Sequence, residues 1–264
     1  MAKTFDEHLA KGISLLEAGD YKKGCAAFRK CTEIEPQNPE GYFNLGDALA
    51  ADEKPEEAIN AYLKGLEFAP DDIEALTALG DIYFELGRHK EALQTYGRVT
   101  EIAPQESDGY VNIGLVYNSM ERTDDAIKAY NSALALDPDN VFAYNALGDA
   151  WYGLGERDKA IAAFRKGVEI DPHDATAHFN LGELYYDLGE FSDAERECLE
   201  AIRLDPAFTL PYLTLGSLYM DQEHIGEAIK ALEAYLKMEK SPQAADTVAE
   251  VKAVVEGLKA ELKK

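Results

Sequence analysis

Residues 141–174 have the sequence VFAYNALGDAWYGLGERDKAIAAFRKGVEIDPHD, in which two helical patterns flank a short turn. In the first pattern, Tyr144, Leu147 and Trp151 recur at the spacing of one helix face. Gly155 follows, and glycine readily adopts the left-handed conformation that commonly ends a helix. The first half of this stretch therefore predicts a helix that ends in a tight turn.

The second half of the stretch predicts another helix, with Ala160, Phe164 and Gly167 on one face. Pro172 ends that helix, because proline cannot continue the hydrogen-bond ladder. Asp174 can cap the helix that follows. Equivalent residues elsewhere in the chain are also good caps: Asn38, Asp72 and Asn140.

The same pattern recurs every 34 residues along the chain. The eighth place of each unit is a glycine, namely Gly12, Gly46, Gly80, Gly114, Gly148, Gly182 and Gly216. A proline lies near the end of the first six units: Pro36, Pro70, Pro104, Pro138, Pro172 and Pro206. An aromatic column in the second helices holds Phe28, Tyr62, Tyr96, Tyr130 and Phe164. The recurring glycine predicts that the two helices of a unit approach closely, since a larger side chain would hold them apart.

These columns resemble the tetratricopeptide repeat family, whose pattern is a large residue, Leu-Gly, an aromatic residue, and then Ala, an aromatic residue and Pro. The resemblance implies an all-α fold, a right-handed superhelical solenoid of antiparallel helix hairpins that forms one domain over residues 1–264. The seven expected repeats are 5–38, 39–72, 73–106, 107–140, 141–174, 175–208 and 209–242. One repeat cannot bury its apolar face alone, so stacked neighbours are expected to share a core.

Residues 243–264 predict a capping helix after the seventh repeat. Its apolar stripe consists of Ala245, Val248, Val251, Val254, Val255 and Leu258. Repeat arrays need such a helix to cover the open end of their core.

The chain is strongly acidic, with 50 Asp and Glu residues against 26 Lys and Arg residues and a formal net charge of -24. Such a surface repels nucleic-acid phosphates and anionic lipid headgroups. The sequence therefore favours a protein or peptide partner with a basic or neutral segment, although the charge can also serve solubility alone. No stretch is apolar and long enough to span a membrane. We expect no membrane insertion and a cytoplasmic protein.

Motifs that carry chemistry are missing from the sequence. It contains no GxxxxGK[ST] loop, no GxSxG elbow and no HExxH motif. The three cysteines, Cys25, Cys31 and Cys198, have no CxxC spacing, which argues against a disulfide framework and a zinc site. His178 occupies a column held elsewhere by Tyr or Leu, which predicts a packing role. We therefore expect no catalysis, no metal and no cofactor.

In the family that the chain resembles, the first helices of the repeats line a concave groove. The resemblance implies that places 2, 5, 6, 9, 12 and 13 of each repeat face a partner. From the second repeat onward, the first-helix segments contain eleven acidic residues and no Lys or Arg. The preference of helix ends for charge does not explain the acids at the ninth place, which are Asp47, Asp81, Asp149 and Glu183. These acids predict an acidic binding groove.

Asparagine and aromatic residues share the predicted groove. The asparagines offer a donor and an acceptor to a peptide backbone, and they are Asn44, Asn112, Asn145 and Asn180. The aromatic side chains can anchor a peptide or pack between repeats, and they are Phe43, Phe84, Phe142, Tyr152, Phe179 and Tyr186.

The leading functional interpretation is a protein–protein interaction adaptor that binds a peptide or helix in this groove. An alternative is a self-assembling scaffold, in which the Lys- and Arg-bearing second helices of one copy meet the acidic groove of another. The repeat region of a larger enzyme is a further alternative, against which the predicted capping helix argues. A clamp for acidic tails, as in co-chaperone members of the family, is disfavoured because the groove has no cations.

Overall fold

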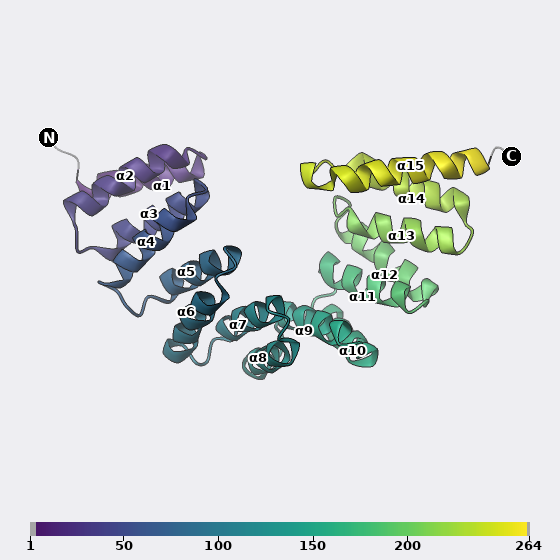
Figure 1. Ribbon diagram of the computed structural model, residues 1–264, viewed down its shortest axis with the longest axis horizontal. Helices are drawn as coiled ribbons and strands as arrows, with labels where there is room; N and C mark the ends of the chain where they lie inside the picture. Colours follow the sequence, from purple (N-terminus) through teal and green to yellow (C-terminus); the bar gives the residue numbers. More distant parts are fainter. Residues whose placement is uncertain (1–3, 263–264) are drawn as a thin grey trace. The chain divides into compact units, whose positions relative to one another are not determined.

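The computed structural model describes residues 4–262, and all the regular structure within them is helical (Figure 1). The predicted fold class, all-α with antiparallel helix hairpins, is confirmed. Contacts within the chain divide it into two compact units, Met1–Pro138 and Asp139–Lys264, which we call the N-terminal unit and the C-terminal unit.

The N-terminal unit contains four helix hairpins. Its helices are α1 (Phe5–Glu17), α2 (Tyr21–Ile34), α3 (Pro39–Ala51), α4 (Pro55–Leu66), α5 (Ile73–Glu85), α6 (His89–Ile102), α7 (Ser107–Ser119) and α8 (Thr123–Leu136). Each odd-numbered helix packs against the even-numbered helix that follows it, and each hairpin packs against the next. The odd-numbered helices are the first helices of the expected repeats.

The C-terminal unit contains three hairpins and a last helix. Its elements are α9 (Val141–Gly153), α10 (Arg157–Ile170), α11 (Ala175–Asp187), α12 (Phe191–Leu204), α13 (Leu210–Asp221), α14 (Ile225–Met238), the short 3-10 helix η1 (Pro242–Ala244) and α15 (Ala245–Glu261). Helix α15 packs on α14 and buries Val251 and Val255. Val254, which the sequence pattern placed in the apolar stripe, is 39 % exposed, because it lies off the line of contact with α14.

The helix caps follow the sequence closely. The side chains of Asn38, Asp72, Asn140 and Asp174 each accept a hydrogen bond from a backbone N–H in the first turn of the next helix, as predicted. Gly155 has a φ of +74°, so its predicted left-handed conformation at the end of α9 is also confirmed. At the corresponding turns, three glutamates take the same conformation, which the sequence did not predict: Glu53, Glu121 and Glu223.

The close approach of paired helices depends on the glycine at the eighth place. A Cβ atom added to Gly46 would lie 2.7 Å from the ring of Tyr62, and one added to Gly148 would lie 2.5 Å from the ring of Phe164. The aromatic side chain of the second helix therefore lies directly on the first helix. Burial of each such ring stabilises the fold by about 1.5–3 kcal/mol.

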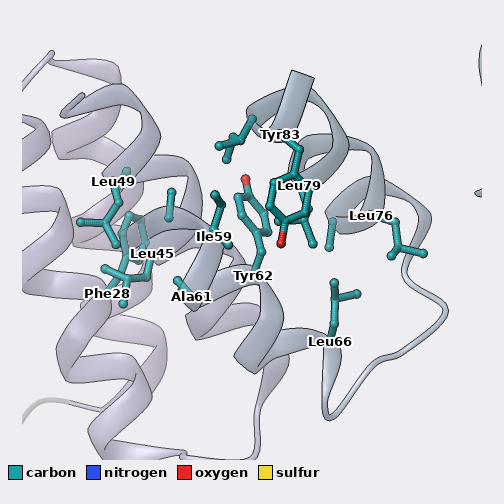
Figure 2. Close-up of a cluster of buried hydrophobic side chains, with 14 of the residues drawn as sticks. Phe28, Leu45, Leu49, Ile59, Ala61, Tyr62, Leu66, Leu76, Leu79 and Tyr83 are labelled. Atoms are coloured by element: carbon teal, nitrogen blue, oxygen red, sulfur yellow. The ribbon is translucent and has the colours of Figure 1, made fainter. Parts of the chain in front are cut away.

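The core of the N-terminal unit is continuous from hairpin to hairpin. Figure 2 shows how side chains from α2, α3, α4 and α5 meet in it. Phe28 of α2, Leu49 of α3 and Leu76 of α5 are almost completely buried. Within this unit, the second helix of each hairpin packs against the first helix of the following hairpin. The polar places of the first helices therefore face solvent.

Candidate peptide-binding surfaces

The predicted acidic residues lie on an exposed face of the first helices. Asp47 on α3, Asp81 on α5, Asp149 on α9 and Glu183 on α11 all have exposed side chains. We call the places that the sequence assigned to the groove the first-helix face of each unit. No Lys or Arg occurs in the first helices α3, α5, α7, α9, α11 and α13. The face therefore has a negative potential in each unit.

In the N-terminal unit, a buried tyrosine holds each of the two carboxylates. Tyr62 of α4 donates its hydroxyl hydrogen to Asp47, and Tyr96 of α6 donates to Asp81 at 2.5 Å. Burial raises the pKa of both phenols, and the hydrogen bonds to the carboxylates add to the shift. One oxygen of each carboxylate is thus held by a buried tyrosine, while the aspartate as a whole remains exposed.

A hollow of about 490 Å³ lies between α3 and α5, and we call it the α3–α5 hollow. Its lining consists of Pro39, Glu40, Phe43, Asn44, Asp47, Tyr62, Asp72, Glu74, Ala75 and Ala78. Three of the predicted site residues therefore meet here: Phe43, Asn44 and Asp47. Four of the lining residues carry a carboxylate, and no lining residue is basic. This is where the first-helix face of the N-terminal unit is both hollow and acidic.

The asparagines differ in how their amides are used. Asn44 donates from Nδ2 to the Glu40 carbonyl of its own helix at 2.9 Å. Asn112 on α7 and Asn180 on α11 are half-buried and make no side-chain hydrogen bond within residues 4–262. The Oδ1 of Asn145 is buried and unpaired among those residues, and it faces Gly167 of α10.

The aromatic side chains also divide into surface and core. Phe43 is half-buried and stacks on Tyr62 with ring centroids 6.3 Å apart, and Phe84 is half-buried beside His89. Phe179, by contrast, is only 6 % exposed and packs edge-on against Phe208, with centroids 5.1 Å apart. The loop before α13 therefore covers the Phe179 ring, which the sequence assigned to the groove.

In the C-terminal unit, tyrosines of the first helices make hydrogen bonds from one repeat to the next. Tyr152 of α9 donates to Asp187 of α11, and Tyr186 of α11 donates to Asp221 of α13 at 2.8 Å. The bond to Asp187 raises the pKa of Tyr152, while burial and the bond to Asp221 raise the pKa of Tyr186 to about 12. Both hydroxyls are thus occupied. Tyr152, which is 42 % exposed, still offers its ring.

The acids at the ninth place of the C-terminal unit have no tyrosine beneath them. Phe164 stands where the N-terminal unit has Tyr62, and Cys198 takes the next equivalent position. Although the side chain of Asp149 reaches solvent, its carboxylate lies in a hollow of about 30 Å³ between α9 and α11. Partial loss of hydration, together with the charge of Glu183, raises the pKa of Asp149 to about 6. Burial and the charge of Asp187 raise the pKa of Glu183 as well.

Models of tetratricopeptide repeats match most of the chain. They cover residues 9–73, 42–105, 114–155, 149–189, 175–208 and 211–242. The chain belongs to the tetratricopeptide repeat family. Tetratricopeptide repeats form extended surfaces for binding other proteins, and this chain has that fold.

Solved structures agree with this assignment. A crystal structure of MamA has 29 % sequence identity and a TM-score of 0.57, over 62 % of this chain and 96 % of that one. A tetratricopeptide repeat protein from Parabacteroides merdae has 19 % identity and a TM-score of 0.73, over 94 % of this chain and 98 % of that one. Yeast Tom70 has 17 % identity and a TM-score of 0.77, over 99 % of this chain and 56 % of that one. The last two show the fold alone. No curated protein sequence matches the chain.

The tetratricopeptide repeats also contain a buried ion pair that the sequence did not reveal. His178 is buried, as its column predicted, and its Nδ1 lies 2.7 Å from Oε2 of Glu197. Its Nε2 lies 3.2 Å from the carbonyl oxygen of Pro172. Because both ring nitrogens face acceptors, the protonated imidazole is favoured and the pKa of His178 is raised. Arg196 donates to the other oxygen of Glu197.

The remaining chemistry of the tetratricopeptide chain is sparse. Within residues 4–262, no group of three or more His, Cys, Asp or Glu side chains is placed to hold a metal ion. No helix in that range is long and apolar enough to cross a membrane. The three cysteines are free and buried, and burial raises the pKa of Cys198 to about 12, which leaves its thiol protonated.

Proposed function

We propose that the chain is an adaptor that binds a basic or neutral peptide segment on the first-helix face of its repeats. The observation that carries this proposal is the α3–α5 hollow, which four carboxylates line beside the half-buried ring of Phe43, without any basic residue. The face in the C-terminal unit has the same sign of charge, from Asp149, Glu183 and Asp187. A partner with cationic side chains would gain attraction at either face.

The arrangement of charge disfavours an acidic partner. A carboxylate-bearing tail placed beside Asp47 would be repelled, and no lysine or arginine of α3 or α5 could offset that repulsion. Neutral segments also fit this surface, because Asn44 and Asp47 offer acceptors to backbone N–H groups. The proposed compartment is the cytoplasm, which suits three buried cysteines without a disulfide.

The test uses three labelled peptides of one length and sequence that carry lysine, serine or glutamate at the same positions. We expect affinity for the full chain, measured by fluorescence anisotropy, to fall in the order lysine, serine, glutamate. Affinity for the lysine peptide should fall as salt is raised, because exposed charges are screened. Equal affinity for all three peptides, or binding that ignores salt, would remove the electrostatic proposal.

A matched pair of variants locates the surface. Asp47→Asn with Asp81→Asn removes two charges from the first-helix face, and Glu33→Gln with Asp124→Asn removes two from the exposed second helices. We expect only the first pair of substitutions to weaken binding of the lysine peptide. An equal loss in both would mean that net charge, rather than this face, attracts the peptide.

Self-association is the second candidate function, in which second-helix cations of one copy meet the acidic face of another. Many of those cations are already paired on their own surface, as Arg29 is with Glu57 at 2.7 Å and Arg203 with Glu200 at 2.6 Å. The adaptor is therefore the better supported candidate. Light scattering over a range of protein concentrations tests the scaffold, which requires the mass to rise with concentration.

A further inference from the structure

We infer that the α3–α5 hollow is a subsite for an arginine side chain of the partner, which it selects over lysine. This inference rests on the proposed adaptor function and names the side chain that one part of the first-helix face recognises. It follows from three properties of the hollow: the hydrogen-bonding character of its polar groups, the shape of its apolar part and the way Asp47 is held.

The polar lining of the hollow offers mainly acceptors. The hydroxyl of Tyr62 already donates to Asp47, so it is not available as a donor to a ligand. Asn44 uses one of its two Nδ2 hydrogens for the Glu40 carbonyl, and its Oδ1 accepts no hydrogen bond from the described residues. The carboxylates of Glu40, Asp47 and Glu74 accept only. The complementary group is therefore a cation with many N–H donors, and a guanidinium has five where an ammonium has three.

The apolar lining of the hollow combines small side chains with an aromatic ring. The ring of Phe43 stacks on Tyr62, and Ala75 and Ala78 face the same space from α5. A planar guanidinium can lie on the face of an aromatic ring while its edge bonds to carboxylates. An ammonium is a more strongly hydrated point charge, and it cannot make the planar contact and the forked hydrogen bonds together.

The carboxylate of Asp47 is positioned before any ligand arrives. Tyr62 is 2 % exposed, and its ring is held against Gly46, where even a Cβ atom would clash. The phenol hydroxyl, in turn, holds Oδ1 of Asp47 and leaves Oδ2 without a hydrogen bond from the described residues. A preorganised acceptor of this kind favours geometric discrimination between cations over simple attraction of positive charge.

The occupant is argued from charge complementarity. Four carboxylates surround the hollow, and two of them are engaged within the fold: Asp47 by Tyr62 and Asp72 by the backbone of Ala75 at 2.9 Å. Glu40 and Glu74 are exposed at the first turns of their helices, so they can reach a guanidinium from either side. We therefore assign the hollow to an arginine of a partner peptide rather than to an apolar or acidic side chain.

The experiment compares two peptides of identical sequence that carry either arginine or lysine at every basic position. We expect the full chain to bind the arginine peptide about 3- to 10-fold more tightly by isothermal titration calorimetry. Asp47→Asn should reduce this ratio to nearly one, because the held acceptor loses its charge. Asp124→Asn is the matched control, since it removes an equal charge from the exposed surface of α8 and should leave the ratio unchanged.

Ala78→Leu is an independent probe, because it fills the hollow without changing charge. We expect this variant to lose the arginine preference while it still binds both basic peptides, and circular dichroism checks that its helices are intact. Equal affinity of the wild-type chain for the two peptides overturns the arginine subsite. If both then bind more tightly than the serine peptide, the proposed function survives; if neither does, both conclusions fall. A ratio that is lowered equally by Asp47→Asn and Asp124→Asn also overturns the subsite.

Discussion

In the N-terminal unit, each acid at the ninth place accepts a hydrogen bond from a tyrosine of its own repeat. In the C-terminal unit, the tyrosine–aspartate hydrogen bonds of the first-helix face link one repeat to the next. Tyr62 and Tyr96 reach up from the second helices to Asp47 and Asp81. In the C-terminal unit, Phe164 replaces the tyrosine and has no hydroxyl to donate. The tyrosines there lie on the first helices and bond sideways to the following repeat.

The difference teaches that one repeat column can carry two kinds of carboxylate. The acid at the ninth place is exposed in both units, so a sequence alignment of the repeats would treat the positions as equal. The side chain beneath the acid decides whether the carboxylate has a hydrogen-bond donor. Where a buried phenol donates, the carboxylate has a fixed partner; where phenylalanine lies beneath, Asp149 has a pKa of about 6 and no protein donor within the described chain.

The largest expected effect concerns the buried pair of the C-terminal unit. The column of Glu197 is otherwise small and is filled by Ala27, Ala61, Thr95, Ala129, Ala163 and Ala231. Glu197→Ala leaves His178 without its buried partner, and we expect a loss of about 3–5 kcal/mol in the free energy of unfolding. His178→Tyr together with Glu197→Ala restores the pattern of the other repeats, and it should recover most of that loss in urea unfolding.

The same pair predicts a pH dependence. Because the folded-state pKa of His178 is raised, its contribution to stability is complete below the unfolded value of about 6.5 and is lost as the pH rises through the folded value. The double variant should remove this fall. A wild-type unfolding free energy that does not decline over that range would contradict the charged state assigned to His178.

The next effect concerns the glycines beneath the aromatic rings. Gly80→Ala places a Cβ atom 2.5 Å from Tyr96, and Gly148→Ala places one 2.5 Å from Phe164. Overpacking should cost each variant about 1–3 kcal/mol, less the roughly 1 kcal/mol that alanine gains in a helix. We expect Gly80→Ala to be the more harmful by about 1 kcal/mol, because displacement of the Tyr96 ring also breaks the bond to Asp81. Equal losses in urea unfolding would show that this hydrogen bond adds no stability.

Exchange of tyrosine and phenylalanine beneath the ninth-place acid should change whether that carboxylate has a hydrogen-bond donor. Tyr96→Phe removes the donor to Asp81, with an expected loss of about 0.5–1.5 kcal/mol. Phe164→Tyr supplies a hydroxyl beneath Asp149, so the pKa of Asp149 should fall from about 6 toward its ordinary range. NMR titration of the carboxyl carbon measures that value. An unchanged pKa in Phe164→Tyr would mean that the added hydroxyl does not donate to Asp149.

The raised pKa of Asp149 also predicts how the free energy of unfolding depends on pH. Because folded Asp149 holds its proton more tightly than unfolded Asp149, its ionisation works against folding as the pH rises from about 4 to about 6. Asp149→Asn should therefore gain stability relative to the wild type across that window. The control is Asp124→Asn on α8, for which no such gain is expected.

The smallest effect extends the comparison to the hairpin turns. Glu53, Glu121 and Glu223 hold φ near +60°, where Gly155 holds +74°. Replacement of any one of these glutamates by glycine should raise the free energy of unfolding by about 0.5–1 kcal/mol, because glycine adopts this conformation without strain. Gly155→Ala should act in the opposite direction, since its Cβ atom meets nothing and only backbone strain changes.

Local features of the fold could be predicted from the sequence, because each depends on residues close together in the chain. The caps at Asn38 and Asp174, the turn at Gly155 and the close approach of two helices at Gly46 all belong to this class. The position of the acids on an exposed face was what the resemblance to the repeat family implied. Whether that face binds a peptide stays a prediction.

Contacts that cross a repeat boundary were missed. The burial of Phe179 depends on Phe208, which lies in a loop that the repeat pattern does not specify. The bond from Tyr152 to Asp187 requires the stacking distance between two hairpins, although the recurrence of a tyrosine and an aspartate 35 residues apart was a readable signal. Within a repeat, a tyrosine 15 residues after an aspartate was a second readable signal, which Tyr62 and Tyr96 both show.

The route of these hydrogen bonds bears on how such an array can be lengthened or recombined. A repeat such as 39–72 closes its Tyr62–Asp47 bond internally, so a gene duplication that copies it would carry donor and acceptor together. In the C-terminal unit, the donor Tyr152 and the acceptor Asp187 belong to neighbouring repeats. Separation of these repeats would leave each side chain without its hydrogen-bond partner. The hydrogen bond that holds the acid of the first-helix face would therefore survive the transfer of a single N-terminal repeat, whereas the tyrosine bonds of the C-terminal unit survive only if neighbouring repeats move together.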